Sequence, residues 1–132
     1  MYKELADQYR IQFGEQSENY ANVIVSWAIA QANSDSSFDS KPYLEQSLKI
    51  LSAIVSDSSI SVIRLKQHLA FSYMNANEDK KALAMLSDIK KYAHGADLVS
   101  IYTGESQLYR KLGEPEKAFA AASDALNMSE EL

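Results

Sequence analysis

A stretch of the chain repeats itself 36 residues later, and this echo constrains the fold more than any other feature. The segment YMNANEDKKALAMLSD, residues 73–88, aligns with YRKLGEPEKAFAAASD, residues 109–124. The identical positions are the pairs Tyr73/Tyr109, Glu78/Glu114, Lys81/Lys117, Ala82/Ala118, Ala84/Ala120, Ser87/Ser123 and Asp88/Asp124. Self-similarity at a period of about 34 residues is typical of stacked helix-turn-helix repeats. The pattern favours a binding module over an enzyme.

Composition and charge narrow the class of protein. A chain of 132 residues is long enough for one domain with its own core. A net charge of −5 argues against general binding to nucleic acid or to an acidic membrane surface. The absence of cysteine excludes disulfides, thiolate metal sites and a cysteine nucleophile. Residues 21–30 are too few to span a bilayer and the charged N-terminus is no signal peptide. We therefore expect a soluble cytoplasmic protein, or a periplasmic one if the chain is a fragment of a larger protein.

Apolar residues recur at three- and four-residue spacing almost throughout, which predicts an all-α fold. We expect seven helices, over residues 2–13, 17–32, 42–55, 62–75, 78–93, 97–112 and 115–128. Serine- and aspartate-rich segments separate the second, third and fourth of them. Gly14, Gly95 and Gly113 are expected to end the first, fifth and sixth.

Short links between the predicted helices indicate antiparallel neighbours, and hence three hairpins. The single domain, residues 1–132, divides into an N-terminal helix (1–16) and hairpins at 17–57, 62–95 and 97–128. Two helices approach closely only where one presents a side chain as small as Ala or Ser. Ala82 and Ala118 are expected at such crossings, with Ser47 in the matching place of the first hairpin and Ala70 and Ser106 on the opposite helices.

At these positions the chain resembles the tetratricopeptide repeat (TPR) family, with about three repeats. In the third hairpin the family's spacing of small, aromatic, turn, small and small residues is matched by Ser106, Tyr109, Gly113, Ala118 and Ala125. In the second hairpin the matching residues are Ala70, Tyr73, Ala82 and Ile89. Asn77 replaces the turn glycine there, and the first repeat is degenerate. The resemblance implies a right-handed α-α superhelix of stacked antiparallel helix hairpins. The alternative is an ordinary helical bundle with an accidental echo.

The resemblance further implies a concave groove lined by the first helix of each hairpin. Its expected residues are Arg64, Gln67, Phe71, Met74, Asn75, Ser100, Thr103, Gln107, Arg110 and Lys111. In the first hairpin the corresponding residues are expected to be Asn22, Ser26 and Ile29. Such a groove is polar and mildly basic, and would suit an extended peptide or an amphipathic helix with some acidic residues. The family's clamp for terminal carboxylates is not expected, because Gln67, Phe71, Ser100 and Gly104 stand at the clamp positions. The alternative is that these residues form an ordinary solvated helix face.

The sequence has few residues in patterns typical of catalytic, cofactor-binding or metal sites. We therefore expect no catalytic residues, no cofactor and no metal. His68 and His94 lie on different predicted elements, and neither has a ligand partner four residues on. We expect His68 at a groove edge or partly buried, and His94 on the surface near a helix C-terminus. The four glycines are scattered and form no phosphate loop. The carboxylates are expected on exposed helix positions.

Three functions follow from these observations. The first is a non-enzymatic interaction module, an adaptor or secretion-chaperone-like protein that holds a peptide or helix of another protein in its groove. The second is a sensor or regulatory TPR domain cut from a larger membrane-bound or transcription-regulating protein. The third, an enzyme with an unrecognised site, would require a deep polar pocket that holds His68 or clustered carboxylates. An exposed outer side of the last helix, around Phe119 and Leu126, would also predict homo-oligomers through that helix, or a longer parent chain.

Overall fold

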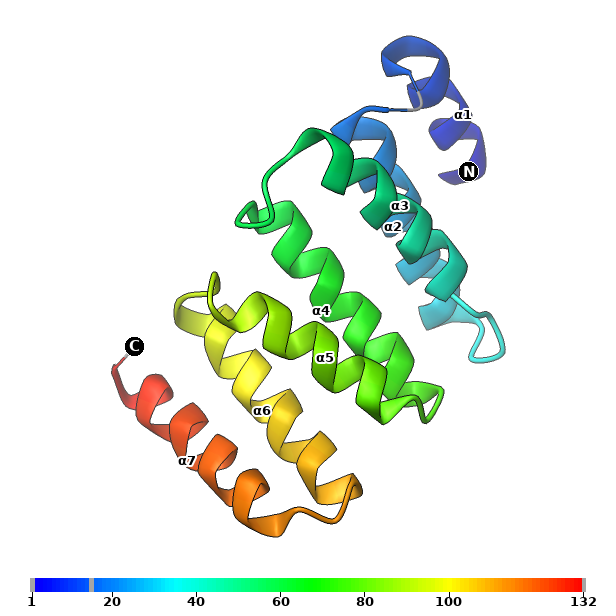
Figure 1. Cartoon of the computed structure of the whole chain (residues 1–132). Helices are drawn as coiled ribbons and strands as arrows, with labels where there is room; N and C mark the ends of the chain where they lie inside the picture. Colours follow the sequence, from blue (N-terminus) through cyan, green and yellow to red (C-terminus); the bar gives the residue numbers. More distant parts are fainter. Residues whose placement is uncertain (1, 15, 132) are drawn as a thin grey trace.

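The computed structural model describes residues 2–14 and 16–131, and within them the chain forms seven α-helices and no strand (Figure 1). Met1, Glu15 and Leu132, which the predicted domain limits include, lie outside the described residues. The helices are α1 (Tyr2–Phe13), α2 (Glu18–Ser34), α3 (Lys41–Ile54), α4 (Ile60–Asn75), α5 (Asp79–Lys90), α6 (Gly95–Lys111) and α7 (Pro115–Glu131). The predicted all-α fold is confirmed.

The helices form a row in which each packs on the one before it (Figure 1). Helices α1 and α7 lie at opposite ends of this row. Consecutive helices run antiparallel, so that α2–α3, α4–α5 and α6–α7 are three successive hairpins. Helix α4 also contacts α6, although α5 lies between them in sequence. The first helices of the second and third hairpins therefore run side by side and in the same direction.

The start of α4 lies two residues before the predicted position, at Ile60. Ser59 precedes it with an extended backbone, as an N-cap residue does, and its carbonyl accepts a hydrogen bond from the N–H of Ile63 at 3.0 Å. The serine-rich segment 56–61 thus ends one helix and also supplies the first turn of the next.

Gly95 begins α6 and does not end α5, which corrects the prediction. Helix α5 stops at Lys90, and the N–H of Ala93 closes the chain back onto the carbonyl of Ile89 at 3.1 Å. Gly95 has φ +56, a left-handed value that a residue without Cβ adopts at little cost. His94, expected beside a helix C-terminus, is instead the N-cap of α6.

The turns of the second and third hairpins have the same backbone conformation despite different residues. Asn77 has φ +61 and Gly113 has φ +77, and the two positions are 36 residues apart. Asparagine is one of the few residues with a side chain that visits this left-handed region routinely. In both turns the next N–H donates to a tyrosine carbonyl at 2.8 Å, from Glu78 to Tyr73 and from Glu114 to Tyr109. The missing turn glycine in the second hairpin therefore leaves the turn unchanged.

Small side chains are buried at the helix crossings, as the sequence predicts. Ala82 is 0% exposed and Ala118 is 7% exposed. In the first hairpin the buried hydroxyl of Ser47 donates to the carbonyl of Ala21 on the facing helix at 3.1 Å. In the third, the hydroxyl of Ser106 donates in the same way to the carbonyl of Ala118 at 3.0 Å. These contacts let the helix backbones approach closely, because no bulky side chain intervenes.

Two clusters of buried side chains form the core, and α4 contributes to both. One lies among α2, α3 and α4, and the other among α4, α5 and α6, with Tyr73 and Met85 packed against both. The long α2–α3 link is held down by an aromatic group, in which Trp27 meets Tyr43 edge-on at 4.7 Å between ring centroids and Phe38 stacks on Tyr43 at 5.5 Å.

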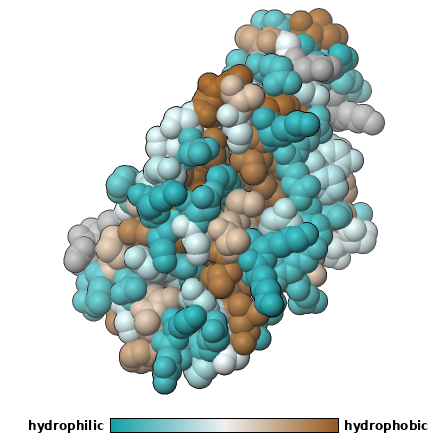
Figure 2. All heavy atoms as spheres, viewed as in Figure 1, coloured by the Kyte–Doolittle hydropathy of each residue, from teal (hydrophilic) through white to brown (hydrophobic). Residues whose placement is uncertain are grey.

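Exposed apolar side chains are unevenly placed. On the face shown in Figure 2, apolar residues form a broken line among hydrophilic ones. On α7, Phe119 is 75% exposed and Leu126 is 61% exposed. The outer side of the last helix is therefore partly bare, as the sequence predicts.

Candidate binding site between α4 and α6

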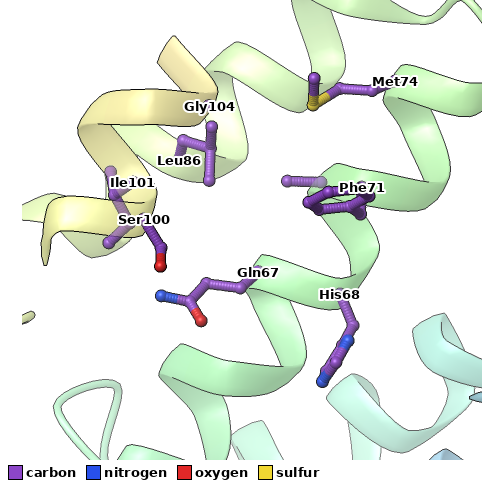
Figure 3. Close-up of a pocket in the computed structure, with 9 residues that line it drawn as sticks. Gln67, His68, Phe71, Met74, Leu86, Ser100, Ile101 and Gly104 are labelled. Carbon is purple, nitrogen blue, oxygen red and sulfur yellow. The ribbon is translucent and has the colours of Figure 1, made fainter. Parts of the chain in front are cut away.

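A hollow of about 200 Å³ lies where α4, α5 and α6 meet (Figure 3). We refer to it as the α4–α6 hollow. It is lined by Gln67, His68, Ala70, Phe71, Met74, Leu86, Ser100, Ile101 and Gly104. Most of this lining is apolar, so the hollow can take an apolar group out of water.

The hollow owes its shape to Gly104, in the middle of α6. A Cβ atom at this position would lie 2.9 Å from the Cδ1 methyl of Leu86 on α5. The residue 36 positions earlier, on α4, is His68. The same repeat position thus carries an imidazole in one hairpin and no side chain in the next, which leaves space beside α6.

Phe71 is the most prominent apolar residue at this site. Its side chain is 65% exposed, and Met74, one turn further along α4, is half-buried. Both side chains extend from α4 beside the hollow in Figure 3. A large aromatic side chain left in water forgoes roughly 2 kcal/mol that burial would supply. A partner that covers Phe71 would therefore gain binding free energy.

Polar groups are confined to one side of the hollow. The side chains of Gln67 and Ser100 point towards each other across it (Figure 3). The Nε2 of Gln67 donates to the main-chain carbonyl of Asp97 at 3.3 Å, which ties α4 to the first turn of α6. Ser100 is exposed, and its hydroxyl is available to a ligand.

His68 lines the hollow, but its ring points away from Phe71 (Figure 3). Burial against neighbouring side chains lowers the pKa of His68, although part of the side chain reaches solvent. The imidazole is therefore neutral at neutral pH and adds no charge to the hollow. Its place fits the expectation of a residue at a groove edge.

Among the groove residues predicted in the first hairpin, Asn22 and Ser26 line a separate hollow beside α1. The ten predicted on α4 and α6 fall into three groups. Those that line the hollow are Gln67, Phe71, Met74 and Ser100. Those that are exposed on α4 or α6 but outside its lining are Arg64, Thr103, Gln107 and Arg110.

The remaining two, Asn75 and Lys111, lie elsewhere. Asn75 lines a separate hollow beside the α2–α3 link. The Nζ of Lys111 lies 3.0 Å from a carboxylate oxygen of Asp79, so this lysine joins α6 to the start of α5.

Sequence reasoning missed Ala70, Leu86 and Ile101 as lining residues of the hollow. It expected His68 only at a groove edge, and it named Gly104 only as a departure from the carboxylate clamp. A glycine inside a helix is a visible signal, because it costs about 1 kcal/mol relative to alanine and marks a place where something approaches closely. Gly104 could have been found in this way. Leu86 could not, because the second helix of a hairpin is not expected to reach the face of the first helices.

Glu105 corrects the expectation that the carboxylates are exposed. It is 1% exposed and pairs with Lys90 on α5, with 3.2 Å between the Lys90 Nζ and its Oε1. Lys90 also lies over the ring of Tyr102, 5.4 Å from the centroid. The pair joins the second hairpin to the third.

The described residues contain neither a helix suited to spanning a membrane nor a group of metal ligands. Across residues 2–14 and 16–131, no helix is both long and apolar enough to cross a membrane. In the same part of the chain, no three His, Cys, Asp or Glu side chains are grouped so as to hold a metal ion.

Fold and hollow together define an all-α, repeat-like helical protein. No family model matches the sequence, and no curated protein matches it. Among solved structures the chain is similar to BtubC (BKLC) from P. vanneervenii, with a TM-score of 0.88 and 16% sequence identity. The match covers 98% of this chain and 54% of that one, so the chain spans about half the length of its structural neighbour. At this identity the similarity concerns the fold alone.

Proposed function

We propose that the chain is a TPR-like protein-interaction module, a right-handed superhelix that holds a segment of another protein against the α4–α6 hollow. The observation that carries the proposal is Phe71, a largely exposed phenylalanine beside an apolar hollow. The buried small residues at the crossings and the matching left-handed turns at Asn77 and Gly113 support the TPR-like arrangement. The role is that of an adaptor or secretion-chaperone-like protein, and the bound segment is a peptide or an amphipathic helix.

The chain offers a matched pair of residues for testing this proposal. Phe71 and Phe119 are both exposed phenylalanines on helices, but only Phe71 borders the hollow. A random peptide library would be selected on the intact protein, and the enriched peptides tested on Phe71→Ala and Phe119→Ala. We expect Phe71→Ala to weaken their binding at least tenfold, and Phe119→Ala to leave it unchanged.

Arg110→Ala should weaken the same peptides by a smaller factor, because it lies beyond the lining. Circular dichroism would check that all variants stay helical. If the enriched peptides bind Phe71→Ala as well as the natural sequence, the hollow is not their site and the proposal is wrong.

The exposed face of α7 favours a second role. Phe119 and Leu126 would be covered by a second copy of the chain or by further protein, as in a regulatory domain of a larger protein. Sedimentation at high concentration would compare the natural sequence with the double variant Phe119→Glu, Leu126→Glu. An associating natural chain and a monomeric variant would support homo-oligomers through α7. A monomeric natural chain would remove them.

A further inference from the structure

Two exposed positive charges lie on the helices that form the α4–α6 hollow, although the protein as a whole is negatively charged. The chain carries −5 overall, yet Arg64 on α4 and Arg110 on α6 are exposed and make no ion pair with any described residue. Lys66, Lys90 and Lys111, by contrast, each have a carboxylate partner. The two arginines are therefore the cations on α4 and α6 that are available to a ligand.

The size and lining of the hollow limit what can enter it. Its volume of about 200 Å³ is below the roughly 300 Å³ at which pockets begin to hold drug-sized ligands. One large apolar side chain, such as that of leucine, methionine or phenylalanine, suits this space better than a whole small molecule. Gln67 and Ser100 stand at its polar side, where they can bond the main chain of the segment that carries the side chain.

Along the helix axes, Arg64 precedes the lining residues of α4 and Arg110 follows those of α6. Arg64 is one helical turn before Gln67 and His68, and Arg110 is six residues beyond Gly104. Because α4 and α6 run in the same direction, the 36-residue repeat places Arg110 level with Met74 (110 − 74). Ten residues of helix separate that level from Arg64, or about 15 Å. An extended chain covers 15 Å in about five residues.

We infer that the α4–α6 hollow binds one large apolar side chain of an extended, acidic segment. The acidic residues of that segment lie two to three positions before and after the apolar residue, and their carboxylates pair with Arg64 and Arg110. This inference rests on the proposed function and specifies the partner. Arginine suits the task because its guanidinium forms two parallel hydrogen bonds with a carboxylate. The acidic residues close to the lining in sequence are engaged within the protein. Glu105 pairs with Lys90, and Asp88 pairs with Lys66. Asp97 is half-buried, and its carbonyl accepts the hydrogen bond from Gln67.

Three synthetic peptides test the inference by fluorescence anisotropy. The first has a central leucine with glutamates two and three positions to either side. In the second, lysines replace the glutamates. In the third, alanine replaces the leucine. We expect the natural sequence to bind the first peptide at least about tenfold more tightly than either of the others, with an advantage over the second that shrinks as salt is added.

Charge reversal in the protein supplies the sharper test. The double variant Arg64→Glu, Arg110→Glu should prefer the lysine peptide over the glutamate peptide. The control is Lys49→Glu, Lys80→Glu, which makes the same change in net charge at two exposed lysines without ion pairs among the described residues. The control should keep the natural preference.

Filling the hollow separates the apolar requirement from the charges. Ser100→Phe places a ring at the lining and should abolish discrimination between the leucine and alanine peptides. Thr103→Phe, on the same helix outside the lining, should preserve it. Failure of the glutamate peptide to bind, or no change of preference in the charge-reversed variant, overturns the inference. If the inference fails but library-selected peptides still require Phe71 for binding, the proposed function stands. If no selected peptide requires Phe71, the inference and the proposed function are both wrong.

Discussion

The first hairpin, α2–α3, and the last, α6–α7, have the same contact where their helices cross. They differ in the turn that joins the two helices. In each, a buried serine hydroxyl donates to a carbonyl of the facing helix, from Ser47 in one and from Ser106 in the other. The last hairpin turns tightly through Gly113 at φ +77. The first has a longer link, closed by the aromatic group around Trp27.

The two end hairpins are also joined differently to the middle one. The first is joined through an exposed hydrogen bond of 2.7 Å, in which the Tyr73 hydroxyl donates to Glu45. The last is joined through the pair of half-buried Lys90 and buried Glu105. The comparison shows that close helix approach depends on small side chains, whereas turns and hairpin junctions can be built in several ways.

The largest expected effect comes from a bulky residue at the crossing. Ser47→Leu should lower the free energy of unfolding by about 3 kcal/mol, because α3 lies between α2 and α4 and cannot move away. Ser106→Leu should cost about half as much, because α7 is the last helix and can shift outwards. Urea denaturation would measure both. Equal losses would show that α7 is held as firmly as the inner helices.

Removing the cation that pairs with buried Glu105 should have the next largest effect. Lys90→Met leaves the carboxylate of Glu105 without a partner, and we expect a loss of about 2 kcal/mol in the free energy of unfolding. Adding Glu105→Leu should recover most of that loss, because no charge then remains buried. A double variant as unstable as the single one would mean that the lysine acts through its packing on Tyr102 and not through charge.

The serine hydrogen bonds themselves should contribute less. Ser47→Ala and Ser106→Ala each keep the crossing small and remove one hydroxyl, and each should cost about 1 kcal/mol. Similar values measured by chemical denaturation would support a shared role in the two hairpins. A negligible cost in only one of them would break the comparison.

The smallest effect concerns pH. Burial and the hydrogen bond to Glu45 raise the pKa of Tyr73 from 10.0 to about 12. The folded protein thus holds the phenolic proton more tightly than the unfolded chain does. The stability this provides is complete below pH 10 and is lost as the pH rises towards 12. Melting temperatures across this range should fall less for Tyr73→Phe than for the natural sequence, while Tyr109→Phe should behave as the natural sequence does.

Much of the fold could be predicted from the sequence, because the helix period and the repeat are both local patterns. The turn at Asn77 followed from its alignment with Gly113, and the burial of Ala82 from its alignment with Ala118. The start of α4 and the end of α5 were harder to predict. Serines at 56–61 favour both a loop and a helix cap, and Gly95 fits either the end of one helix or the start of the next.

The candidate site was predicted only in part. Phe71 and Met74 were predicted because the family resemblance assigns them to the groove face of that helix. The hollow beside them depends on how closely α6 approaches Leu86, a distance that no local pattern contains. The buried state of Glu105 was missed for the same reason, since its neighbours on α6 give no sign that Lys90 of another helix covers it.

The pair of Lys90 and Glu105 also fixes how one hairpin is seated against the next. If α6 slid along α5 by one helical turn, about 5.4 Å, the ammonium and carboxylate would separate and a lone anion would be stranded in the interior. Sliding is thereby penalised, whereas alanines and leucines alone would tolerate neighbouring registers. Since the same alignment brings Gly104 against Leu86, this pair also helps to preserve the hollow beside Phe71, together with the Lys111–Asp79 pair.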